Sequence, residues 1–148
     1  AGLPLDDVGR HAVMKELTEA YQSGGGLHLI KYARSSLGNY ADEFLSKLVG
    51  KVTDFGKMGK VVDDPGVAVG FFNDHALKKH GVTSDMVKSW SMLPKKVLSQ
   101  NNGERYLYIT AQGAYVLDAA TGRVITAYTV MQYAPEMRDV AWLLGLLE

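Results

Sequence analysis

Residues 104–130 decide the fold, and they read ERYLYIT, AQG, AYVLDA, ATG and RVITAYTV. The first, third and fifth of these segments are rich in β-branched and aromatic residues, which favour strands. The two connectors are of hairpin length, and each contains a glycine that can adopt a turn conformation. We therefore predict three antiparallel strands at about 104–110, 114–119 and 123–130, with residues 97–100 as a fourth.

Two short helices are predicted before these strands. The first runs from His75 to His80, and Gly81 is well placed to end it. Thr83 can cap the second, which continues to about Leu93 until Pro94 closes it. Just upstream, the apolar run 67–72 is expected to form a strand or a buried loop.

The first half of the chain has a helical pattern. Apolar residues recur at spacings of three and four over residues 6–21, 27–37 and 39–52, and the glycine run 24–26 separates the first two helices. Residues 53–68 are rich in Gly, Asp and Lys and predict a connector, whereas 135–147 predict an amphipathic terminal helix.

This order of elements predicts an α+β fold, with N-terminal helices packed on a C-terminal antiparallel β-meander and a terminal helix. A length of 148 residues suits one compact domain. We expect a single domain over 1–148, composed of a helical part, 1–65, and a helix-and-sheet part, 66–148.

Composition restricts the function further. The formal net charge is zero, which argues against a broadly basic nucleic-acid coat protein. The stretch from His75 to Arg105, however, contains six Lys and Arg residues but only two acidic residues. Positive charge is therefore concentrated beside the histidines in the sequence. The chain has no cysteine, which excludes disulfides and thiolate metal sites, and no apolar run long enough to span a bilayer. The chain begins at Ala1 without a signal-peptide pattern, so we expect either an excised piece of a longer protein or a free protein that has been processed.

The helix 75–80 carries the best candidates for acid–base chemistry. His75 and Lys79 are four residues apart and project from the same side, with Lys78 adjacent. His80 lies near the helix C-terminus, where the dipole favours its charged form. Helical geometry favours His75 as the reactive imidazole and His80 as a helix-end or packing residue. For each histidine taken alone, an ordinary structural role is the favoured interpretation. The five-residue spacing of the two histidines does not match a helical metal pair, so we predict no metal site.

The last strand carries a pair of hydroxyl groups. Alternation places Thr126 and Tyr128 on one face with Val124, and Ile125 and Ala127 on the other. Such a pair can hold a phosphate or orient a general acid, although threonine and tyrosine are also common strand formers.

Basic and aromatic residues outside this helix and strand are candidates for contacts to RNA. Arg105 and Arg123 can each clamp a phosphate through two hydrogen bonds, and Lys95 and Lys96 add positive charge. Tyr108 can stack on a base, with Tyr106 on the same face. The alternative is an aromatic cross-strand ladder flanked by solvated arginines.

Several short motifs resemble one family. His75-Ala-x-x-x-His80-Gly81, Val82-Thr-Ser-Asp, Pro94 and the closing Val116-Leu-Asp118 to Gly122-Arg-Val-Ile-Thr126-Ala-Tyr128 are similar to toxin nucleases of the barnase/EndoU/colicin/RelE superfamily. The similarity covers about residues 70–130 and includes the C-terminal toxin domains of contact-dependent growth inhibition proteins.

The resemblance implies metal-independent cleavage of RNA, commonly tRNA, by attack of the 2′-hydroxyl on the adjacent phosphate, without a cofactor. It assigns catalytic positions to His75, Thr126 and Tyr128, whereas Lys79 rests on helix geometry. The substrate-binding candidates are then Lys78, His80, Lys95, Lys96, Arg105, Tyr108 and Arg123. A cognate immunity protein is the implied partner. The implied setting is the C-terminal part of a secreted or cell-surface effector that acts in the cytoplasm of a competing bacterium. The alternative function is a non-catalytic RNA-binding or protein-interaction module that uses Tyr106 and Tyr108 on an exposed sheet.

Overall fold

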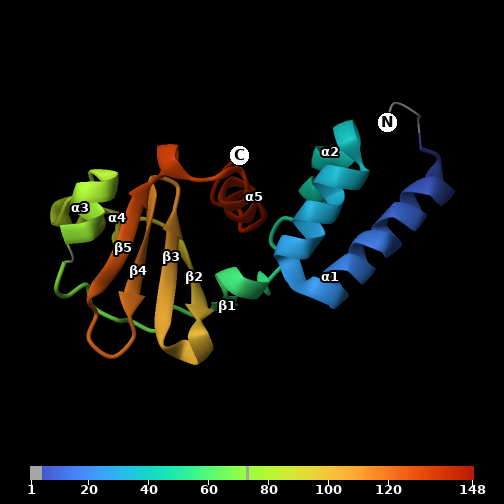
Figure 1. Ribbon diagram of the computed structural model, residues 1–148. Coiled ribbons are helices and arrows are strands. Elements are labelled where there is room, and N and C mark those ends of the chain that lie inside the picture. The colour runs from blue at the N-terminus through green and yellow to red at the C-terminus, as the bar shows by residue number, and fades with distance from the viewer. Residues whose placement is uncertain (1–4, 73) are drawn as a thin grey trace.

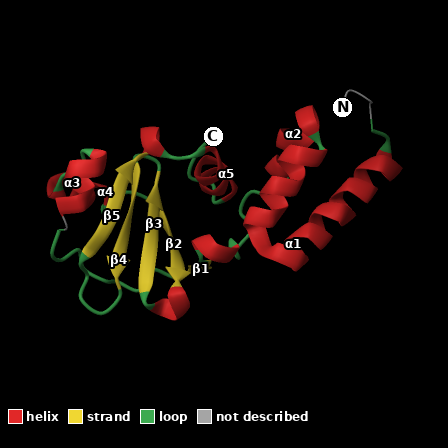
Figure 2. Cartoon of the chain, viewed as in Figure 1, coloured by secondary structure: helices red, strands yellow, loops and turns green. Residues whose placement is uncertain are grey.

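The computed structural model describes residues 5–72 and 74–148, without the side chains of Asp74, His75 and Leu77, and its fold class is α+β as predicted. Figure 1 shows the layers in order: two short helices, an antiparallel sheet, the C-terminal helix and a helical hairpin at the N-terminal end. Figure 2 shows that the strands gather in one sheet, with the helices on either side of it.

The sheet has five strands in the order of the chain, each antiparallel to its neighbours. The predicted strands are β2 (Lys95–Gln100), β3 (Arg105–Thr110), β4 (Gly113–Asp118) and β5 (Val124–Thr129). Sequence patterning missed β1 (Lys60–Val62), which lies in the predicted connector. Three residues are too few to show alternation, and β1 exists because its backbone pairs with β2.

The N-terminal hairpin is the element α1 (Asp7–Ser36), which bends at Gly25. Gly25 has φ 79° and ψ −170°, so α1 consists of two helical arms, and the two predicted helices are confirmed. Gly26 lets the bend lie close to the segment around Asp54, since the Gly26 N–H donates to the carbonyl of Asp54 at 2.6 Å. A Cβ atom on Gly26 would lie 2.6 Å from the ring of Phe55.

The third predicted helix is shorter than expected. The chain continues through the 3₁₀ turn η1 (Gly38–Tyr40) into α2 (Ala41–Ser46), and then forms turns where the pattern predicted helix to residue 52. Gly50 has a φ of 81° and donates its N–H to the carbonyl of Leu143 at 2.8 Å. The contact with the C-terminal helix therefore takes the place of a last helical turn.

The two faces of the sheet are covered by different helices. On one face, α3 (Asp74–His80) and α4 (Ser84–Trp90) pack on the apolar cluster that includes Trp90, Tyr108 and Tyr115. On the other, α5 (Pro135–Leu143) and the arms of α1 share a second cluster with the sheet. As predicted, Thr83 caps α4 by accepting a hydrogen bond from the N–H of Met86 at 3.2 Å.

The segment 67–72 is neither a full strand nor a buried loop. It makes an isolated parallel bridge from Phe72 to Val124, and the side chain of Phe71 is 73% exposed. The remaining 3₁₀ turns are η2 (Gly56–Met58), η3 (Asn101–Gly103) and η4 (Val130–Gln132). Within the described ranges, none of the helices is long and apolar enough to cross a membrane.

Candidate active site

A β-bulge in β5 decides which side chains of the last strand lie together. Val116 pairs with Thr126, but the next residue of β4, Leu117, pairs with Val124, so Ile125 is an extra residue in β5. Val124 therefore joins the cluster beneath α3 and α4, whereas Ile125 packs on the opposite cluster.

Because of the bulge, half of the predicted alternation is wrong. Thr126 and Tyr128 share a face as predicted, but Val124 and Ile125 have exchanged sides, and Ile125 does not lie with Ala127. The strict period of two fails because one residue of β5 has no partner in β4.

A pocket lies at the edge of the sheet, where β5 meets the end of α3 and the start of α5. We call it the β5 pocket. Its volume is about 280 Å³, and it is lined by His80, Thr126, Tyr128, Gln132, Ala134 and Met137. The structure thus brings one predicted histidine to both predicted hydroxyl residues, although the sequence separates them by more than forty positions.

Aromatic contacts fix the centre of the β5 pocket. The rings of His80 and Tyr128 meet edge to face, with centroids 6.0 Å apart and an interplanar angle of 62°. Tyr128 makes a second such contact with Tyr133, at 5.7 Å and 81°. Tyr133 is itself anchored, because its hydroxyl donates to the carbonyl of Thr110 at 3.0 Å. A tyrosine is a protonated donor at neutral pH, and burial raises the pKa of Tyr128 further.

The sequence did not predict Gln132, Ala134 or Met137 as pocket residues, and Gln132 is the polar one among them. Its Nε2 donates to the carbonyl of His80 at 3.1 Å, and its Oε1 accepts from the N–H of Thr129 at 2.9 Å. The Thr129 side chain accepts a hydrogen bond from the Gln132 backbone N–H, which completes a capping box. The sequence signal was present, since Thr129 and Gln132 have the Thr-x-x-Gln spacing of that motif.

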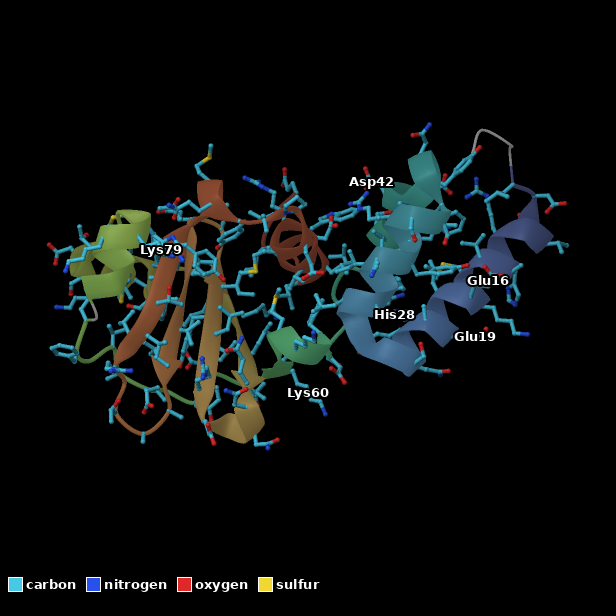
Figure 3. All side chains as sticks on the ribbon, viewed as in Figure 1. Glu16, Glu19, His28, Asp42, Lys60 and Lys79 are labelled. Atoms are coloured by element: carbon cyan, nitrogen blue, oxygen red, sulfur yellow. The ribbon has the colours of Figure 1, made fainter. Side chains whose placement is uncertain are left out.

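The structure does not describe the side chain of His75, so the predicted pairing of His75 with Lys79 lies outside the described residues. The backbone of His75 belongs to α3, as expected. Lys78 and Lys79 are exposed in the last turn of α3, next to His80. Figure 3 shows Lys79 on α3 beside β5. Lys79 directly precedes His80, so its positive charge lies on the same turn of α3 as the pocket histidine.

The other predicted basic residues are spread over the sheet. Lys95 begins β2, on the far side of β3 and β4 from the pocket, and its Nζ donates to the carbonyl of Ser91 at 3.0 Å. Lys96 is exposed beside it. Arg105 pairs in register with Asp118, and Arg123 follows in the hairpin that leads to β5. These residues therefore do not form one patch with the β5 pocket.

Tyr108 does not form an exposed stacking platform. Its side chain is 2% exposed, and its ring lies parallel to that of its cross-strand partner Tyr115, with centroids 4.9 Å apart. The predicted contact of Tyr108 with RNA bases is therefore wrong for this structure, because α3 and α4 cover this face of the sheet. The alternative, an aromatic cross-strand ladder, is what the structure contains.

In the part of the chain that the structure describes, no three His, Asp or Glu side chains are grouped so that they could hold a metal ion. Comparison of the chain with protein-family models, curated proteins and solved structures gave no match.

Proposed function

We propose that this domain is an endoribonuclease that cleaves RNA in the β5 pocket by attack of the 2′-hydroxyl on the adjacent phosphate. One observation carries the proposal: an imidazole from α3 and two hydroxyls from β5 line the same pocket. Imidazole suits proton transfer near neutral pH, and hydroxyl donors suit the oxygens of a phosphate.

The reaction requires two proton transfers. The 2′-oxygen loses a proton and bonds to phosphorus, the bond to the 5′-oxygen breaks, and that oxygen gains a proton. The products are a 2′,3′-cyclic phosphate and a 5′-hydroxyl. We assign one transfer to His80, and His75 on the same helix stays the predicted group for the other.

The hydroxyl groups have a different task from the histidines. Thr126 and Tyr128 would donate hydrogen bonds to the non-bridging phosphate oxygens, where negative charge builds up in the transition state. The phenol of Tyr128 is protonated at neutral pH, as this role requires, and burial raises its pKa further. Lys78 and Lys79, exposed in the last turn of α3, would attract the RNA backbone and balance its charge.

The family resemblance supports the finer parts of the proposal. It favours tRNA as the substrate, a cognate immunity protein as the partner, and delivery into competing bacteria as part of a larger effector. A non-catalytic module that stacks bases on Tyr106 and Tyr108 has less support, because Tyr108 is buried.

The test is cleavage of radiolabelled tRNA, ribosomal RNA and DNA by the purified chain. We expect tRNA to be cut, DNA to be resistant, and a single 2′-deoxy substitution to block cleavage at that position. His80→Ala should lower the rate by about 10² to 10⁴-fold. His28→Ala is the matched control, because His28 is exposed on α1, which Figure 3 shows at the opposite end of the molecule from α3.

His75→Ala is measured in parallel with His80→Ala. Loss of cleavage in both variants is expected. Full activity of a folded His80→Ala variant would remove the β5 pocket from the reaction. Binding of tRNA without any cleavage by the wild-type chain would instead support the non-catalytic alternative.

A further inference from the structure

We infer that Gln132 is a positioning residue that sets the place of His80 relative to Tyr128. The inference rests on the proposed function for its effect on cleavage, but its structural content can be measured independently. Gln132 connects α3 to the end of β5 through one amide group: Nε2 contacts the carbonyl of His80, and Oε1 contacts the N–H of Thr129.

The first contact holds the end of a helix. The last carbonyls of a helix lack partners within the helix, so the end of α3 needs hydrogen bonds from outside. Gly81, with a φ of 68°, turns the chain directly after His80, and Gln132 Nε2 reaches the His80 carbonyl at 3.1 Å. This bond joins two residues 52 positions apart and fixes the backbone that carries the imidazole.

The second contact joins the same amide to β5, the strand that carries the two hydroxyls. Thr129 is the last residue of β5 and directly follows Tyr128. Because the Gln132 amide bonds to Thr129 at one atom and to His80 at another, it sets the spacing between the two elements. The edge-to-face contact of the His80 and Tyr128 rings is the arrangement that this spacing maintains.

Other contacts keep α3 on the sheet when Gln132 is replaced. Ala76 in the middle of α3 and Val82 just after it are both fully buried in the cluster that α3 and α4 share with the sheet. Gln132 itself is exposed. Its loss should therefore leave the fold intact and loosen only the end of the helix, which is where His80 lies.

Three variants separate the effect of the Gln132 amide contacts from the effect of the capping box. Gln132→Met removes both contacts of the amide. Gln132→Glu keeps an acceptor for the Thr129 N–H but removes the donor to His80. Thr129→Ala is the matched control, because it removes the other half of the capping box and leaves the Gln132 amide in place.

The readout is NMR of ring protons, with circular dichroism to establish folding. The wild type and Thr129→Ala should show a nuclear Overhauser contact between the His80 and Tyr128 rings, and both Gln132 variants should lose it. In the cleavage assay, we expect kcat to fall by about tenfold in both Gln132 variants, with a smaller change in KM.

Two outcomes would overturn the inference. A ring contact that persists in folded Gln132→Met would show that other groups position His80. Loss of the contact in Thr129→Ala as well would assign the effect to the cap of η4. The ring contact is measured without RNA, so a chain that cleaves no RNA would refute the proposed function and leave this test of Gln132 valid.

Discussion

Arg34 and Asp139 are 105 positions apart, and a paired hydrogen bond joins them. Nη2 of Arg34 donates to Oδ1 of Asp139 at 2.6 Å, and Nε donates to Oδ2 at 3.2 Å. The guanidinium also contacts Asp42 of α2. Hydrogen bonding to Asp139, together with Asp42, raises the pKa of Arg34. One side chain of α1 therefore ties the N-terminal hairpin both to α2 and to the C-terminal helix.

The first prediction concerns this link. Arg34→Gln and Asp139→Asn should each lower the free energy of unfolding by about 1 kcal/mol, because the bidentate pair is only partly screened by solvent. Asp139 is 15% exposed, whereas Asp42 is 72% exposed, so Asp42→Asn should have a smaller effect. Urea denaturation measures all three. An equal loss in Asp42→Asn would contradict the dominant role of Asp139.

The second prediction concerns the hydroxyls of β5. Thr126→Val keeps the shape of the side chain and removes a donor from the pocket, so we expect wild-type thermal stability and a turnover lowered by about 100-fold. Tyr128→Phe should act in the same direction and should keep the ring contact with His80. Ile125→Val is the control, since Ile125 does not line the pocket. Wild-type cleavage by both pocket variants would exclude this strand from the reaction.

The third prediction is that cleavage does not depend on a metal ion. The proposed reaction uses only side chains and the hydroxyl of the RNA itself, so activity should persist in excess EDTA. The 3′ ends should carry 2′,3′-cyclic phosphate, which an end-specific ligation assay detects. Loss of activity with the chelator, followed by recovery on addition of one divalent ion, would show that the mechanism is different.

The fourth prediction concerns alkaline pH. Burial, with the charge of Asp64 as a smaller cause, raises the pKa of Tyr108 to about 12, compared with 10.0 for a free tyrosine. The unfolded chain then releases this proton at lower pH than the folded chain. The contribution to stability is complete below pH 10 and is lost as the pH rises through the folded pKa.

Burial also raises the pKa of Tyr115 and Tyr133, so all three tyrosines act in the same direction. The free energy of unfolding should fall steadily above pH 10, as measured by urea denaturation at each pH. Tyr108→Phe should make this fall less steep. A stability that stays constant between pH 10 and pH 12 would contradict the prediction.

The sequence by itself determined the class of the fold and most of its elements. The strands β2 to β5 could be recognised because short β-rich segments alternate with glycine-containing connectors. Helix ends could be recognised where a local hydrogen bond or turn fixes them, as Thr83 and Gly81 do. These signals concern neighbours in the chain, which is why composition and spacing contain them.

The tertiary structure alone decided what lies in the pocket. The bulge at Ile125 depends on how β5 pairs with β4, and it moved Val124 to the opposite face from the one predicted. Tyr108 is buried because α3 and α4 cover that face, not because of the residues beside it in the chain.

The hydrogen bond between Gln132 and His80 was likewise decided by the tertiary structure. The bond spans 52 positions and depends on the packing of the end of α3 beside the end of β5. Periodicity could place Thr126 and Tyr128 on one face of a strand, since side-chain direction alternates locally. It could not place His80 opposite them, because that distance depends on the packing of separate elements.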